Sequence, residues 1–139
     1  MVRVNIIHPK KLADQHLIAE YNEILMLLGY VKKYPEEKGI PESYTLGKGH
    51  IRFFKNKLIY LKERHERLKD EMRERGFKTN KTINLNKFPS NLINDWEPSN
   101  KDEKIIISRI TEKINKKPDY YRYYGEPKPC GFFVSLLNN

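Results

Sequence analysis

The feature that most restricts the fold of this chain is a regular spacing of apolar side chains between residues 51 and 72. They recur at alternating intervals of three and four residues, at Ile51, Phe54, Leu58, Leu61, Leu68 and Met72, with His65 on the same side. This spacing predicts one long amphipathic helix, and Gly76 is a typical helix end. Such a helix must bury its apolar side against other elements. We interpret His65 as a core or boundary residue.

A second helical pattern begins near the amino terminus, at about Pro9 or Asp14, and runs to Leu28. Proline suits the first turn of a helix, aspartate is a common N-cap, and Gly29 is a plausible stop. The residues before it alternate weakly and predict an extended N-terminal arm.

A third helix is predicted over roughly 101–117, where Pro118 stops it. The connecting segments 34–49 and 77–100 are irregular and rich in glycine, proline or asparagine. We therefore expect an all-α fold: a single compact domain over residues 1–139, with three main helices, long irregular connections and an extended N-terminal arm. The apolar side chains of the C-terminal tail are expected to cover the core.

The charge of the chain points to a polyanionic partner. Among 139 residues, 27 are Lys or Arg and 18 are Asp or Glu, a net charge of +9. Nucleic acid is the leading candidate, and a lysine-rich genomic composition is the competing explanation. No apolar run approaches the roughly 20 residues that span a bilayer. A single cysteine and no signal-peptide pattern favour a cytoplasmic location, nucleoid-associated if the source is prokaryotic. We expect no membrane association and a monomer.

Two polar clusters are candidates for chemistry. In a helix, His16, Glu20 and Glu23 fall at i, i+4 and i+7, which fits a metal site, a solvated surface, or a catalytic carboxylate with supporting groups. The remaining histidines are scattered singly, so we expect no metal. The second cluster is DYYRYYG, residues 119–125, whose aromatic rings could stack on bases or dock the tail on the helices.

Several sequence blocks resemble one known family. They are R-V-N at 3–5, L-A-D-Q-H-L-I-A-E-Y-x-E at 12–23, L-G-x-G-H-I-x-F-F at 46–54, K-L at 57–58, R-G-F at 75–77, I-x-x-K-I at 110–114 and P-x-Y-Y-x-Y-Y-G at 118–125. In this order, over residues 2–125, they resemble the pyrimidine-dimer DNA glycosylases. The tail 126–139 is not covered by the resemblance.

The resemblance implies a DNA repair enzyme that acts on double-stranded DNA containing damaged bases, with no cofactor and no metal. In that family the α-amine of residue 2, freed by removal of the initiator methionine, attacks the sugar of a pyrimidine dimer. The N-glycosidic bond breaks, an imine to the protein forms, and β-elimination cuts the strand. The nucleophile here would be the amine of Val2, and the catalytic carboxylate would be Glu23.

The same resemblance implies a set of DNA contacts. They are Arg3, Gln15, His16, Asn22, Arg109, Lys113, Tyr120, Tyr121, Arg122, Tyr123 and Tyr124. A surface role for His16 stays open, and tail packing is an equal alternative for Tyr123 and Tyr124. Glu20 is expected to be structural, with a buried partner such as an arginine, because an acid facing DNA would repel it.

Three positions depart from the phage enzyme of that family. Residue 2 is Val rather than Thr, and Asn22 and Met26 stand where that enzyme has arginines that grip DNA. A related glycosylase or lyase for another lesion or for abasic sites is therefore an alternative. Two further alternatives are a non-catalytic DNA-binding domain and a metal-dependent nuclease that uses His16, Glu20 and Glu23.

Overall fold

Helices make up most of the regular structure in the computed structural model, which describes residues 3–139. Val2, the predicted nucleophile, lies outside the described residues. The elements are η1 (Pro9–Lys11), α1 (Asp14–Lys33), η2 (Gly47–Gly49), α2 (His50–Phe54), α3 (Leu58–Glu74), η3 (Ser90–Leu92), α4 (Asn100–Lys116), β1 (Arg122–Tyr123), β2 (Glu126–Pro127) and α5 (Cys130–Leu137). The predicted all-α class is confirmed, and the short hairpin β1–β2 is the one sheet within the described residues.

Helix α1 begins at the predicted Asp14 but continues past Gly29 to Lys33. The predicted stop at Gly29 was wrong because the buried apolar pattern continues to Val31. A glycine inside a helix costs only about 1 kcal/mol, which such burial offsets. The helix ends instead before Pro35, since a residue that precedes proline disfavours helical angles.

The long helix predicted over residues 51–72 is divided into α2 and α3. Lys57 leaves helical geometry, with φ −129° and ψ 47°. Its Nζ donates to the carbonyl oxygen of Phe53 at 2.7 Å and caps the end of α2. The apolar spacing did not reveal this break, because both pieces still face one core. Helix α3 ends at Glu74, and the predicted Gly76 follows its C-cap residue, Arg75. The φ of Gly76 is +85°, and Phe77 N donates to Met72 O at 2.8 Å.

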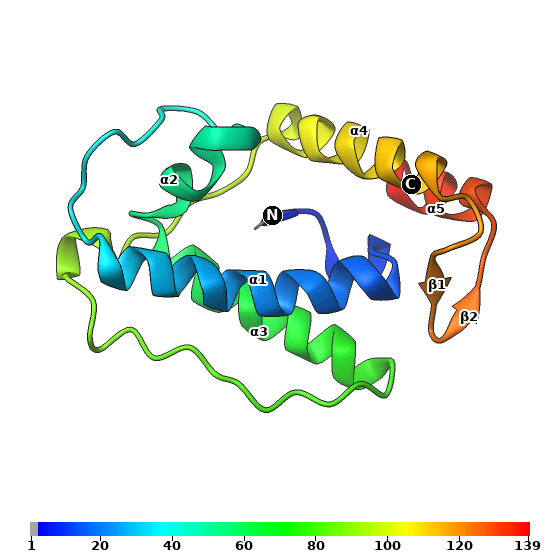
Figure 1. Ribbon diagram of the computed structural model, residues 1–139, viewed down its shortest axis with the longest axis horizontal. Helices are drawn as coiled ribbons and strands as arrows, with labels where there is room; N and C mark the ends of the chain where they lie inside the picture. Colours follow the sequence, from blue (N-terminus) through cyan, green and yellow to red (C-terminus); the bar gives the residue numbers. More distant parts are fainter. Residues whose placement is uncertain (1–2) are drawn as a thin grey trace.

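The core takes residues from all five α-helices and from the N-terminal arm. Helix α1 packs against α3, and α5 packs against α4, with the N-terminal arm in the space between α1 and α4 (Figure 1). Phe133 and Leu137 of α5 are each only 1% exposed. The tail therefore covers the core, as expected. No helix within residues 3–139 is long and apolar enough to cross a membrane.

Candidate active site

A hollow of about 330 Å³ opens beside the N-terminal arm, between α1, α4 and the segment before the hairpin. Its lining is Arg3, Asn5, Gln15, His16, Ala19, Glu23, Ile110, Lys113, Tyr120 and Tyr121. Most of these side chains were predicted as site residues from the sequence. Asn5, Ala19 and Ile110 were not. The fold thus gathers residues that are more than a hundred positions apart in the chain.

The amino-terminal arm reaches Glu23 directly. The backbone amide of Arg3 hydrogen-bonds to the Glu23 carboxylate. Burial raises the pKa of Glu23, and the nearby charge of Glu20 adds to that rise, while the Arg3 amide and the charge of Arg3 oppose it. Glu23 is therefore a half-buried carboxyl whose proton affinity exceeds that of a free glutamate.

Glu20 is turned away from the hollow and forms a buried ion pair. It is 1% exposed, and its Oε2 accepts from Arg64 Nε at 2.7 Å while its Oε1 accepts from Arg64 Nη2 at 2.9 Å. Asn5 Nδ2 donates to the same Oε1 at 2.9 Å. Arg64 Nη1 also donates to the carbonyl oxygen of Ile7. Glu20 thus has the arginine partner predicted for it, and it links the arm to α3.

This pairing bears on the metal-dependent nuclease alternative. That alternative required His16, Glu20 and Glu23 to converge on one ion, and Glu20 is occupied by Arg64 and Asn5. Within residues 3–139, no three or more His, Cys, Asp or Glu side chains are grouped so that they could hold a metal ion.

A second set of contacts holds the arm at Val4, the residue after Arg3. Val4 N donates to His50 Nε2 at 2.8 Å, and Tyr44 OH donates to Val4 O at 3.1 Å. Burial raises the pKa of Tyr44, so its phenol keeps the donated proton. The backbone of Val4 is therefore held on both its amide and its carbonyl side.

Cations border the hollow and act on one another. Burial lowers the pKa of Arg3, and repulsion from Arg109 adds to this. Burial also lowers the pKa of Lys113, with repulsion from Arg3, Arg109 and Lys116. These groups lie close enough to disfavour one another's charge, and a bound phosphate would relieve that repulsion. The site thus combines one carboxyl with a basic border.

His16 forms an uncharged aromatic wall of the hollow. Burial lowers its pKa to about 4, and Arg3 and Lys113 contribute further. Its ring centroid lies 4.7 Å from that of Tyr121. Within the described residues, its buried Nδ1 has no hydrogen-bond partner. At neutral pH this side chain presents an uncharged imidazole to whatever enters the hollow.

The side chain of Gln15, on α1, holds the aromatic segment, residues 119–125, by two hydrogen bonds. Gln15 Nε2 donates to Tyr120 O at 2.8 Å, and Arg122 N donates to Gln15 Oε1 at 3.0 Å. The hairpin that follows turns through Tyr124 and Gly125, whose φ angles are 51° and 80°. Two successive positive φ values are typical of a type I′ turn between antiparallel strands. Tyr120 is left 54% exposed at the edge of the hollow.

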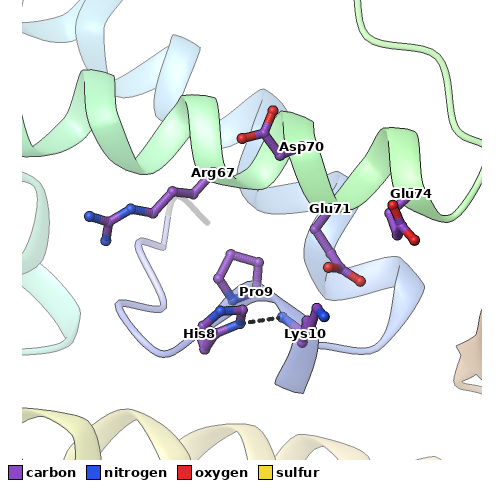
Figure 2. Close-up of a pocket in the computed structure, with 7 residues that line it drawn as sticks. All are labelled: His8, Pro9, Lys10, Arg67, Asp70, Glu71 and Glu74. Atoms are coloured by element: carbon purple, nitrogen blue, oxygen red, sulfur yellow. Dashed lines mark hydrogen bonds between the residues drawn. The ribbon is translucent and has the colours of Figure 1, made fainter.

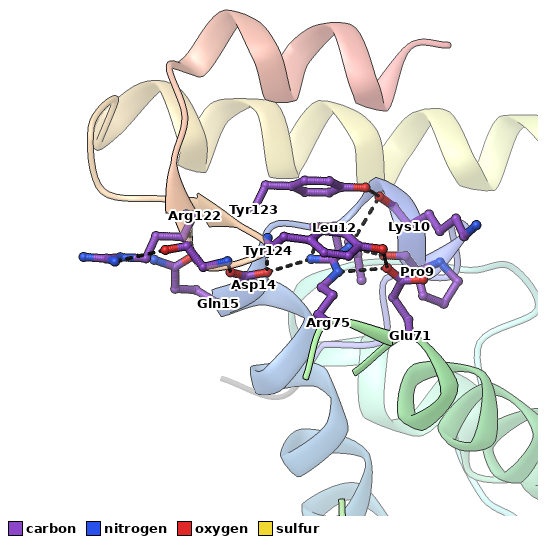
Figure 3. A network of polar contacts seen from close by, with 11 residues as sticks. Pro9, Lys10, Leu12, Asp14, Gln15, Glu71, Arg75, Arg122, Tyr123 and Tyr124 are labelled. Atoms are coloured by element: carbon purple, nitrogen blue, oxygen red, sulfur yellow. Dashed lines mark hydrogen bonds and ion pairs between the residues drawn. The ribbon is translucent and has the colours of Figure 1, made fainter. Parts of the chain in front are cut away.

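Two of the four tyrosines pack against a buried arginine instead of lining the hollow (Figure 3). The Arg75 guanidinium lies 4.4 Å from the ring centroid of Tyr123 and 5.1 Å from that of Tyr124. Arg75 pairs with Asp14 Oδ1 at 2.9 Å and Glu71 Oε2 at 2.8 Å. These contacts match the tail-packing interpretation of the two tyrosines, and their contact with DNA stays a prediction.

The other predicted DNA contacts lie outside the lining of the hollow. Asn22 and Arg122 are exposed, while Arg109 is half-buried and pairs with Glu112 at 3.3 Å. Asn22 Nδ2 donates to Ile18 O at 3.2 Å. Contacts from these side chains to DNA stay predictions too.

A second hollow, of about 370 Å³, is lined by acidic and basic side chains together. It lies between η1 and α3 and is drawn in Figure 2, lined by His8, Pro9, Lys10, Arg67, Asp70, Glu71 and Glu74. Here three acids accompany two cations, Lys10 and Arg67, whereas in the hollow around Glu23 two cations, Arg3 and Lys113, accompany a single acid, a balance that attracts phosphate more strongly. The hollow around Glu23 is the better candidate for a DNA-directed site.

Comparison with known families identifies the family of the chain. A family model described as pyrimidine dimer DNA glycosylase matches residues 1–85, more than half of the chain. The chain belongs to the pyrimidine dimer DNA glycosylase family. DNA is the substrate that membership in this DNA glycosylase family implies. The matched stretch contains the arm and helices α1 to α3, whereas Lys113, Tyr120 and Tyr121 come from outside it and join the site through the fold.

Sequence reasoning missed residues that hold the N-terminal arm or line the hollow. Asn5 and His50 belong to quoted motif blocks, R-V-N and L-G-x-G-H, but no role followed from the motifs alone. Their partners are 15 and 46 positions away in the chain, a pairing that no local pattern contains. Ala19 could have been found, since it follows His16 by three residues and precedes Glu23 by four.

Proposed function

We propose that this chain is a DNA glycosylase with abasic-site lyase activity, acting at cyclobutane pyrimidine dimers through the α-amine of Val2. The observation that carries this proposal is the hydrogen bond from the Arg3 amide to Glu23. Covalent geometry keeps the α-nitrogen of residue 2 less than about 4.3 Å from the Arg3 nitrogen. An amine freed by removal of Met1 would therefore be within reach of the Glu23 carboxyl.

The first step is displacement at the sugar. An α-amine has a pKa of roughly 7.7–8.0, well below that of lysine, so part of it is free base at neutral pH. Repulsion from Arg3 and Lys113 would favour that neutral form further. The nitrogen lone pair bonds to C1′ while the C1′–base bond breaks and its electron pair leaves with the base.

The second step forms the imine. The nitrogen loses a proton, the C1′–O4′ bond opens, and O4′ gains a proton. Glu23 can take the first proton and give the second, because a carboxyl with a raised pKa exchanges protons more readily near neutral pH.

The third step cuts the strand. A base removes a proton from C2′, the C3′–O bond breaks, and the 3′ phosphate leaves while the imine nitrogen accepts electron density. Glu23, whose carboxylate lines the hollow, would act as that base.

Binding would rely on the basic border and on an opened base pair. Arg3, Arg109 and Lys113 can neutralise phosphates, and the exposed ring of Tyr120 can stack on a base. A dimer weakens local stacking and lowers the cost of extruding a nucleotide, which favours damaged over intact DNA.

Borohydride trapping tests the proposal. The protein is incubated with duplexes that contain a pyrimidine dimer, an abasic site or no damage, and sodium borohydride reduces any imine to a stable adduct. We expect an adduct with the two damaged duplexes, no effect of EDTA, and an intact mass that lacks Met1. Absence of adduct at saturating binding would overturn the enzymatic proposal and leave a DNA-binding domain, whose affinity would not depend on Glu23.

A different lesion preference is the second candidate. Asn22 and Met26 are exposed on α1 near Glu23 and lack the positive charge with which the phage enzyme grips DNA. An adduct with abasic DNA but none with dimer-containing DNA would assign this chain to abasic sites or to another lesion.

A further inference from the structure

The imidazole of His50 has both nitrogens committed to backbone groups. Its Nδ1 lies 2.8 Å from Thr45 O, a group that can only accept, so Nδ1 carries the proton. The lone pair of Nε2 is then free to accept from Val4 N, at 2.8 Å. Burial lowers the pKa of His50 and repulsion from Arg3 adds to this, while the Thr45 hydrogen bond and the charge of Glu20 oppose it. The net lowering favours the neutral form that the contact with Val4 requires.

The surroundings of His50 make this contact rigid. His50 is 3% exposed, and its ring meets Tyr44 at 5.5 Å and Phe54 at 5.3 Å between centroids. A Cβ on Gly49 would lie 2.8 Å from Thr45 Cγ2, so glycine allows the loop to close onto the start of α2. The L-G-x-G-H block thus builds a fixed hydrogen-bond acceptor for the arm.

The arm follows an unusual path on the other side of Val4. Ile6 has φ 49°, a conformation that a β-branched residue rarely adopts. Such backbone angles persist only where flanking contacts enforce them. Here these contacts are the hold on Val4 before Ile6 and the Arg64 hydrogen bond to Ile7 O after it. An arm released at Val4 would be free to leave this path.

We propose that His50 is a positioning residue that fixes the N-terminal amine against Glu23 by holding the Val4 amide. The inference rests on the proposed amine chemistry. His50 lines no part of the hollow and acts through the arm, two residues from the nucleophile. Its loss should therefore slow imine formation without weakening DNA binding.

The test measures single-turnover borohydride trapping on abasic duplex DNA, together with binding affinity, for four proteins. His50→Phe keeps an aromatic ring but removes the acceptor, and His50→Gln supplies a side-chain carbonyl that can accept from Val4 N. His65→Phe is the matched control: His65 is also buried, at 0% exposure, but its Nε2 contacts Tyr21 O at 3.1 Å rather than the arm. Thermal melts identify a temperature at which all are folded.

We expect His50→Phe to slow trapping at least 10-fold with affinity changed less than 2-fold, and His50→Gln to recover part of the rate. His65→Phe should lower the melting temperature but keep the wild-type trapping rate. If His50→Phe unfolds below the assay temperature, Tyr44→Phe replaces it, since it removes only the hydroxyl that donates to Val4 O.

Three outcomes would overturn the inference. A folded His50→Phe variant that traps at the wild-type rate would overturn it alone. An equal loss of rate in His65→Phe would show a general effect of core damage. Failure of the wild-type protein to trap would remove the proposed function and this inference together.

Discussion

Glu23 combines partial burial with a hydrogen bond from the backbone, and the two act on its protonation in opposite directions. Burial raises the pKa of Glu23, and the hydrogen bond from the Arg3 amide reduces that rise. The carboxyl therefore holds a proton more tightly than a free glutamate does, which suits the proposed steps in which it accepts and returns protons.

Replacing Glu23 by Gln keeps the shape of this side chain and removes its proton chemistry. We expect the rates of trapping and strand cleavage to fall by about 100-fold or more. Affinity for damaged duplex should be kept or improved, because the substitution removes a negative charge from the hollow. Glu63→Gln, an exposed position on α3, is the control and should leave both quantities unchanged. Weakened binding with an unchanged rate would contradict the catalytic role.

The lowered pKa of His16 predicts a pH dependence of stability. The folded-state pKa is about 4 and the ordinary value 6.5, so the unfolded chain binds the proton more tightly. Stability is fully present above about pH 6.5 and is lost as the pH falls toward 4. Between pH 7 and pH 4.5, we expect His16 to account for a loss on the order of 2 kcal/mol in the free energy of unfolding.

Urea unfolding of the wild type and of His16→Gln at both pH values measures this contribution. Carboxylates and the other buried histidines contribute to both proteins, so the difference between them isolates His16. An equal loss of stability in the two proteins would refute the assignment.

At the scale of elements, the site depends on segments that have little regular structure of their own. The arm, the loop before α2 and the hairpin are each fixed by side chains from helices: His50 for the arm, Gln15 and Asp14 for the hairpin. Asp14 Oδ2 accepts from Gly125 N at 2.7 Å. Helices α1 and α2 thus act as a frame on which the irregular segments are placed.

Two glycines provide opposite tests of this frame. Gly49 lies where an added Cβ would meet Thr45 Cγ2 at 2.8 Å, whereas Gly29 has nothing within 4 Å and lies inside α1. We expect Gly49→Ala to lower the melting temperature and the trapping rate, because it displaces the loop that carries the His50 contact. Gly29→Ala should raise stability by about 0.5–1 kcal/mol through helix propensity, with no change in rate. Thermal melts and trapping assays of both variants check this pair.

Helices were predictable from the sequence to the extent that their signals are local. Gly76 and Pro118 lie just after real helix ends, because C-caps and proline act on adjacent residues. Asp14 begins α1 but is not the predicted N-cap: that position is Ala13, and the Asp14 carboxylate accepts from Arg75, Tyr124 N and Gly125 N instead. The break at Lys57 and the continuation through Gly29 were not predictable, since each depends on burial against other elements. The same limit applied to the site: motif blocks indicated Glu23 and His16, but the buried partners of Glu20 and Val4 come from distant parts of the chain.

At the scale of the whole molecule, the chain carries a net charge of +9. Part of its positive charge lies at the border of the hollow, on Arg3, Arg109 and Lys113. Release of counterions from DNA makes such binding strongly dependent on salt. If Lys113 contacts a phosphate, Lys113→Gln should weaken binding to all duplexes similarly. It should also reduce the slope of log K against log salt by about 0.9.

Titrations from low to physiological salt, read by fluorescence anisotropy, measure that slope. Lys87→Gln, an exposed position in the connection between α3 and α4 that does not line the hollow, is the control and should keep the wild-type slope. An unchanged slope for Lys113→Gln would remove this lysine from the phosphate contacts.

The hydrogen bond between the Arg3 amide and Glu23 also decides how the protein can be handled in the laboratory. An affinity tag or a residual cleavage scar before Val2 would turn the proposed amine into an inert peptide nitrogen. Even one extra residue would move the free amine along the chain by about 3.5 Å. Purification handles therefore belong after α5, and an inactive N-terminally tagged preparation would say nothing about the native enzyme.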